Sequence, residues 1–361
     1  MAKAQILKKY NIDLIQKLII KKGPISKPEL SHLTNLSLPT VNKLVDELLE
    51  EEYIIEDAFQ TGAGAGRKAM TYVVNGNYGT FLILYYLDER WIGCVSNILG
   101  DILYKAEYSL SNRRTEEQFQ VLCDIIEDLM NNAQRIKAIG IGIPGIVMND
   151  DSVAAIPMFP EFEGLQLKNE LSKKYKIPVF IENDVKLMTL GYHSLKMKHV
   201  ENMVYMYIGE GVGGGIILNG KLYKGNTSFA GEFGYIPSNN ITFQKKELNG
   251  GSLELLLLEI KKRMKNPETY QEALELFCEE IGRSLVSCIA TLNPEAVVLY
   301  CNELNVEVLK NISQEIEKYL PSHCVPQIVL TKSDSYGIHG LIYLCQDGLH
   351  SKSVFDEEFD E

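Results

Sequence analysis

Residues 136–147 read Ile-Lys-Ala-Ile-Gly-Ile-Gly-Ile-Pro-Gly-Ile-Val, an apolar run that ends in a loop containing Pro144 and Gly145. Such a run predicts a buried strand over 136–143 that the Pro-Gly pair ends. Strand and helix patterns alternate on both sides of it. Strands are expected at 80–87, 91–98, 102–109, 178–181, 203–208, 214–218, 296–300 and 327–330, and helices at 115–133, 164–175, 185–197, 252–263, 268–291, 304–319 and 336–346. This order predicts an α/β protein with mixed sheets.

The first 75 residues follow a different pattern. Apolar residues at helical spacing predict a helix over 10–22, and Ser26 with Glu29 three residues later predicts the capped start of a second helix. A turn at 35–37 leads into a third helix from about Leu38 to Glu51, and two short strands at 53–55 and 72–74 flank a glycine-rich, basic loop. The helices alone fit any small helical bundle, but the basic loop favours a winged helix-turn-helix.

Charge is distributed unevenly. The whole chain has a net charge of −12, yet residues 1–45 carry +6, residues 46–75 carry −5 and the remainder carries −13. An acidic body limits non-specific adhesion to DNA and confines DNA binding to the basic front. The seven cysteines are scattered, which is typical of reduced thiols. No signal peptide or membrane-spanning run is recognisable, so a cytoplasmic protein is expected.

Five motifs in the α/β part resemble those of the ROK family (repressors, open reading frames and sugar kinases), and they occur in the family's order. They are Gly140–Val147, Pro178–Asp184, Tyr207–Ile217 followed by Asn219-Gly220, Ala230–Tyr235 and Asn293–Leu299. One glycine motif is weak evidence, whereas five in order are strong. The resemblance implies a two-lobed, ribonuclease-H-like (actin-like ATPase, sugar-kinase) fold behind the winged front.

The resemblance also implies a sugar site. Its residues would be Gly145, Asn183, Asp184, Glu232, Tyr235 and Glu254. Amide and carboxylate side chains at the end of a strand suit sugar hydroxyls, and an Asp there can act as a base. Two simpler interpretations stay open: Asn183-Asp184 as a helix N-cap, and Glu232 and Glu254 as solvated surface acids.

Departures from the family pattern favour a sensor over an enzyme. Sugar kinases of this family cradle ATP phosphates with a D-x-G-G-T turn, but this chain reads Asp88-Glu89-Arg90-Trp91 there, and Glu210 replaces the Thr of the second phosphate motif. Two acids and the missing glycines oppose phosphoryl transfer, so Asp184 is expected to be a vestigial base.

The family's zinc ligands are also replaced. Tyr235 stands at the His position, and Lys245, Glu247 and Ser252 stand at the three Cys positions, so neither a metal nor another cofactor is expected. Lys186 replaces a small polar residue and Tyr192 replaces a Glu, which implies a reshaped site.

We therefore predict three segments: a winged helix-turn-helix at 1–75, a ROK sugar-kinase-like domain at 76–347 and an acidic tail at 348–361. The predicted function is a non-enzymatic, DNA-binding regulator, a repressor of carbohydrate-utilisation genes that senses a sugar or sugar phosphate. It would act as a homodimer or higher oligomer on double-stranded operator DNA. The alternatives are an active sugar kinase that carries a DNA-binding domain, and a regulator that responds to a protein. The expected DNA-contacting residues are Ser37, Thr40, Asn42, Lys43, Arg67 and Lys68.

Overall fold

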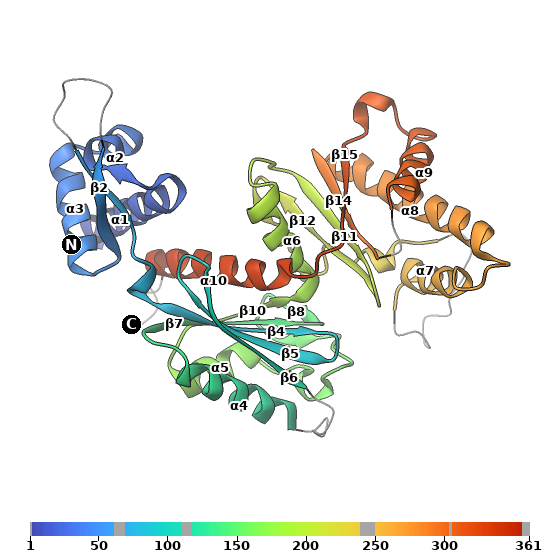
Figure 1. Ribbon diagram of the computed structural model, residues 1–361, viewed down its shortest axis with the longest axis horizontal. Helices are drawn as coiled ribbons and strands as arrows, with labels where there is room; N and C mark the ends of the chain where they lie inside the picture. The colour runs from blue at the N-terminus through green and yellow to red at the C-terminus, as the bar shows by residue number, and fades with distance from the viewer. Residues whose placement is uncertain (1, 61–68, 110–116, 239–249, 303–304, 356–361) are drawn as a thin grey trace.

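The computed structural model describes residues 2–60, 69–109, 117–238, 250–302 and 305–355. It confirms the predicted fold class: a winged helix-turn-helix is followed by a two-lobed α/β domain (Figure 1). Within the described ranges, no helix has the length and apolar content needed to cross a membrane.

The winged domain packs its helices on a small sheet. Its elements are α1 (Ala2–Lys22), β1 (Ile25–Ser26), α2 (Lys27–Thr34), α3 (Leu38–Glu50), β2 (Ile54–Gln60) and β3 (Ala69–Val74), with sheet order β1-β3-β2. The predicted capping box is present, since Ser26 Oγ accepts the Glu29 N–H and the Glu29 carboxylate accepts the Ser26 N–H at 2.9 Å. Apolar residues of α1, α2 and α3 form the buried core against this sheet.

The first lobe is a five-stranded sheet in the order β10-β7-β4-β5-β6. Its strands are β4 (Thr80–Leu87), β5 (Arg90–Asn97), β6 (Ile102–Ser109), β7 (Ile136–Ile143) and β10 (Val179–Asn183), and helices α4 (Gln118–Asn131) and α5 (Leu167–Tyr175) cover one face. The hairpin of β8 (Ile146–Val147) and β9 (Val153–Ala154) follows β7. Parallel pairing of β7 with β10 brings the ends of both strands to one edge.

The second lobe repeats this plan with the order β13-β12-β11-β14-β15. Its strands are β11 (Met203–Ile208), β12 (Val212–Leu218), β13 (Lys221–Leu222), β14 (Ala296–Tyr300) and β15 (Gln327–Thr331), and its helices are α7 (Ser252–Arg263), α8 (Tyr270–Leu292) and α9 (Val306–Glu317). The helices bury a core against β11, β12 and β14.

Two helices join the three parts of the molecule. Helix α6 (Asp184–Lys196) begins where β10 ends and packs on β12, while α10 (Tyr336–Phe355) packs along α6, crosses the first-lobe sheet and contacts α1 (Figure 1). Glycines permit the close contact: a Cβ on Gly191 would lie 1.9 Å from the Tyr336 carbonyl oxygen, and one on Gly340 would lie 1.9 Å from that of Leu187.

Several element boundaries differ from the sequence prediction. Helix α1 begins at Ala2 rather than residue 10, and strand β1 was not predicted. Helix α10 continues past the expected boundary at residue 347 to Phe355, so residues 348–355 belong to a helix and not to a tail. The reason is packing: α10 lies against the first lobe and α1, and such tertiary contacts extend helices beyond local sequence signals.

Replacement of Gly340 by Ala should separate α6 from α10. The new methyl group would overlap the Leu187 carbonyl oxygen, so we expect a loss of about 3 kcal/mol in unfolding free energy, measured by urea titration. Gly213→Ala is the matched control, because its Cβ would meet nothing closer than Val185 Cγ2 at 3.9 Å. Equal losses in the two variants would contradict the proposed close contact.

Candidate functional site

A cleft of about 490 Å³ lies between the two lobes, and all six residues of the predicted sugar site line it. The first lobe contributes Gly145 and the junction of β10 with α6, which carries Asn183 and Asp184. The second lobe contributes the β11–β12 turn with Glu210, then Glu232, Tyr235 and, from α7, Glu254. The structure thus brings together residues as far apart in sequence as Gly145 and Glu254.

Asn183 and Asp184 have structural as well as cleft-facing roles. Asn183 is the N-cap of α6, since its Oδ1 accepts the Lys186 N–H at 3.0 Å, and its Nδ2 donates to the Gly145 carbonyl at 3.1 Å. Asp184 Oδ1 accepts the Val185 N–H at 2.8 Å. Burial raises the pKa of Asp184 to about 7, and the nearby Glu232 carboxylate adds to the rise. The N-cap interpretation and the cleft-lining interpretation of this pair therefore both hold.

The second-lobe residues are held in different ways. Glu254 fixes the β11–β12 turn, because its Oε1 accepts the Val212 N–H at 3.2 Å and its Oε2 accepts the Gly251 N–H at 3.4 Å. Burial raises the pKa of Glu232, Lys186 opposes the rise, and Glu254 adds to it. Tyr235 is exposed, and its ring packs on Phe229.

A tight hairpin turn stands at the edge of the first lobe where the family's phosphate turn would lie. Leu87 pairs with Arg90, so Asp88 and Glu89 form a two-residue hairpin turn with φ values of 48° and 58°. Trp91, at a glycine position of the kinase motif, is fully buried, and its ring stacks on that of Phe159 with 5.6 Å between the ring centroids. Burial raises the pKa of Tyr86, and the charges of Glu89 and Glu210 add to the rise.

The residues at the zinc positions do not fit zinc. Ser252 Oγ donates to the Ile236 carbonyl at 2.9 Å and accepts the Ser238 N–H at 3.2 Å. These two hydrogen bonds join the start of α7 to residues 236–238. Tyr235 offers neither an imidazole nor a thiolate. Lys245 and Glu247 lie outside the described residues.

The predicted DNA-contacting residues of α3 fall into two groups. Ser37 is the N-cap of α3, and its Oγ lies 2.8 Å from Thr40 Oγ1, so these two side chains stabilise the helix start. Asn42 and Lys43 are exposed on the same helix. Arg67 and Lys68 lie outside the described residues.

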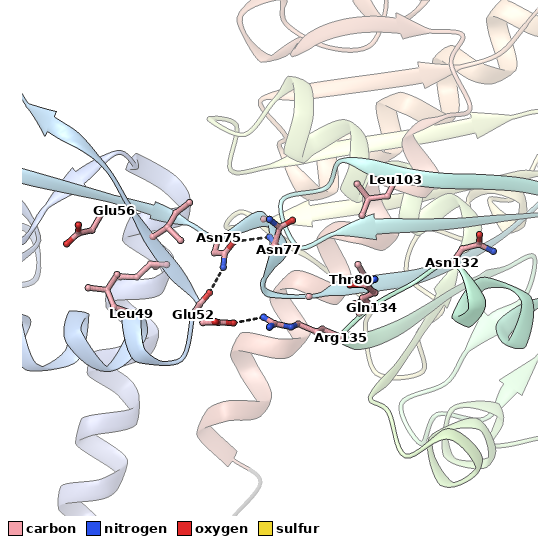
Figure 2. A pocket seen from close by; sticks show the side chains of 14 residues that line it. Leu49, Glu52, Glu56, Asn75, Asn77, Thr80, Leu103, Asn132, Gln134 and Arg135 are labelled. Atoms are coloured by element: carbon pink, nitrogen blue, oxygen red, sulfur yellow. Dashed lines mark hydrogen bonds and ion pairs between the residues drawn. The ribbon is translucent and has the colours of Figure 1, made fainter.

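A larger cavity, about 860 Å³, lies between the winged domain and the first lobe (Figure 2). Arg135 forms an ion pair with Glu52 at 2.6 Å across it, and Asn75 Nδ2 donates to the Glu52 carbonyl at 2.8 Å. Both charged side chains are more than half exposed, so the pair adds little stability. Sequence analysis did not single out this junction, because its residues are distant in sequence and belong to no motif.

Comparisons with known proteins agree with this architecture. The ROK family profile matches residues 90–252, and a winged helix-turn-helix DNA-binding profile matches residues 13–55. A xylose repressor of Caldicellulosiruptor bescii is 29% identical over 70% of this chain and 63% of its own length. A xylose repressor of Bacillus subtilis is 28% identical over 81% of this chain and 82% of its own length.

Two solved structures show the same fold. A ROK family transcriptional regulator, a homologue of the Escherichia coli MLC protein, superposes with a TM-score of 0.80 and 22% identity over 97% of this chain and 99% of that one. The ROK hexokinase of Thermus thermophilus has a TM-score of 0.64 and 18% identity over 75% of this chain and 99% of its own. The hexokinase match covers a smaller share of this chain than the regulator match.

The winged helix-turn-helix DNA-binding profile, together with relatives named repressors that align over most of the chain, identifies a DNA-binding transcriptional regulator. The match of residues 90–252 to the ROK family profile agrees with the resemblance that the sequence motifs indicated.

The raised pKa of Asp184 predicts a pH-dependent stability. A carboxyl group whose pKa is near 7 when folded and near 4 when unfolded destabilises the fold as pH rises from about 4 to 7, because ionisation then favours the unfolded chain. Asp184→Asn removes this ionisation. The melting temperature of the variant relative to wild type should therefore increase between pH 5.5 and pH 8. A difference that is constant with pH would contradict the burial of this carboxylate.

Proposed function

We propose that this regulator is a repressor of carbohydrate-utilisation genes whose α/β domain binds an unphosphorylated sugar without phosphorylating it. The observation that carries the proposal is the composition of the cleft. Asn183, Asp184, Glu232 and Glu254 all line it, and a tight two-residue turn with Asp88 and Glu89 stands where a turn for ATP phosphates would lie. Relatives named xylose repressors agree with a sugar as the effector.

The charge of the cleft favours a neutral sugar over a sugar phosphate. Four carboxylates line it, those of Asp184, Glu210, Glu232 and Glu254, and its described lining includes neither Lys nor Arg. Lys186 lies just behind Glu232, but its side chain is only 1% exposed. Carboxylates accept hydrogen bonds from sugar hydroxyls and repel a phosphate group.

The same features oppose catalysis. Phosphoryl transfer requires neutralisation of phosphate charge, and acids at positions 89 and 210 act in the opposite sense. Asp184 lines the cleft with a pKa of about 7, which suits a general base, so an assay for sugar phosphate is the direct test of turnover.

Helices α6 and α10 offer a route from the cleft to the DNA-binding domain. Helix α6 begins at Asn183 in the cleft, and α10, packed on α6, contacts α1 of the winged domain. A sugar that binds one arrangement of the lobes more tightly than another would bias this helix pair, by no more than its difference in affinity.

A screen of monosaccharides and their phosphates tests the ligand. An unphosphorylated sugar at about one hundred times its dissociation constant should stabilise the native protein by roughly 2.7 kcal/mol and raise its melting temperature. Asp184→Ala and Glu232→Ala should lose this shift, while Glu259→Ala, an exposed acid on α7, should keep it. Stabilisation by sugar phosphates alone, or sugar phosphate formed from ATP and magnesium above background, would refute the proposal.

We further propose that Asn42 and Lys43 contact the operator and that the active form is a homodimer, because specific operators are commonly read by two-fold dimers. On DNA that the wild type selects from a random library, Asn42→Ala should cost about 1–3 kcal/mol and relax specificity, and Lys43→Ala should reduce the salt slope by about one. Lys198→Ala, an equal charge change in the α/β domain, is the control.

Unchanged affinity and salt slope in both α3 variants would remove this helix face from the interface. A monomer at micromolar concentration in sedimentation, with full affinity for a single half-site, would contradict the dimer.

A further inference from the structure

A cluster of buried charges lies directly behind the sugar side of the cleft. Lys186, in the first turn of α6, has a side chain that is only 1% exposed, and the Glu182 side chain at the end of β10 is completely buried. A buried ammonium group is costly unless it is paired and hydrogen-bonded. The contacts of Lys186 therefore indicate what the cluster does.

Lys186 connects helix α6 with the second-lobe segment 224–232. Its Nζ donates to the Ser228 carbonyl oxygen and lies 3.9 Å from Glu232 Oε1. Burial lowers the pKa of Lys186, and the carboxylates of Glu182, Glu232 and Asp184 oppose that shift. One ammonium group thus contacts both the backbone of the segment and the cleft carboxylate at its end.

Three further contacts attach the same segment to the first lobe. Lys224 Nζ forms an ion pair with Glu182 Oε2 at 2.5 Å. Asn149, after β8, donates from Nδ2 to the Asn226 carbonyl at 2.5 Å and accepts from Ser228 Oγ at 3.1 Å. Ser228 is fully buried and has a φ of 57°, so its backbone is held in a conformation that a serine rarely adopts.

We propose that Lys186 is a positioning residue for the sugar: its ammonium group holds segment 224–232 against the first lobe and orients the Glu232 carboxylate toward the cleft. The inference rests on the proposed sugar site, but the hold on the segment does not depend on any ligand. Residues of the second lobe that face the sugar are thereby fixed by the first lobe, from behind the cleft.

The first test needs no sugar. Lys186→Gln keeps a hydrogen-bond donor but removes the charge, and Lys196→Gln makes the same change at an exposed position of the same helix. Hydrogen–deuterium exchange within 224–235 should accelerate about tenfold or more in Lys186→Gln and stay at the wild-type rate in Lys196→Gln. Wild-type exchange in a folded Lys186→Gln protein would overturn the proposal.

If Lys186→Gln does not fold, Lys186→Met provides the same measurement, because it removes the ammonium group from the Ser228 carbonyl oxygen and from Glu232 but fills the buried position with an apolar side chain of similar length. Faster exchange within 224–235 then supports the hold on the segment, and an unchanged rate overturns it.

The second test separates positioning from general structural support. Affinity for the stabilising sugar is measured for Lys186→Gln, Glu232→Gln and the double variant. If Lys186 acts through Glu232, its replacement should weaken binding about tenfold in the wild type and have little effect in the Glu232→Gln background. Equal losses in both backgrounds would overturn the positioning role. If the wild type binds no sugar, the proposed function fails, while the exchange experiment still decides the role of Lys186 in holding the segment.

Discussion

The close contact of α6 with α10 is the constraint on which the arrangement of the whole chain depends. Gly191 and Gly340 let the two backbones approach to a distance that no other residue would permit. The first helix begins in the cleft and the second ends beside the winged domain, so the pair spans all three parts of the molecule. Tightly packed elements of this kind shift as units rather than deform, which makes the pair suited to relaying a small displacement.

The cleft combines two demands that conflict electrostatically. Carboxylates are good acceptors for hydroxyl groups, but their ionised forms are costly in a partly dry space. Burial raises the pKa values of Asp184 and Glu232, and a neighbouring carboxylate adds to the rise in each case. The fold meets this conflict with an ammonium group placed behind the cleft, where it counters the repulsion without facing the ligand. The cleft thereby presents carboxylates to the ligand, and the buried ammonium group reduces the electrostatic cost of gathering them.

Sequence reasoning predicted the features that depend on local signals. The cap at Ser26, the strands of the first lobe and the gathering of motif residues such as Asn183 and Glu232 follow from patterns a few residues long or from the family's motifs. It missed the length of α10 and the role of Lys186, because both depend on contacts between segments far apart in the chain. Lys186 was noticed only as a departure from the family pattern, and nothing in its neighbourhood in the sequence indicates Ser228 as its acceptor.

The tight turn at Asp88 and Glu89 bears on how this domain could change over evolutionary time. Because Leu87 already pairs with Arg90, the two strands leave no spare backbone from which to form a loop around a phosphate. The Trp91 ring, packed on Phe159, would also lose its place in the core if glycine returned there. No single substitution would therefore create a phosphate-binding loop here, because insertion of residues and repacking of the core would both be needed.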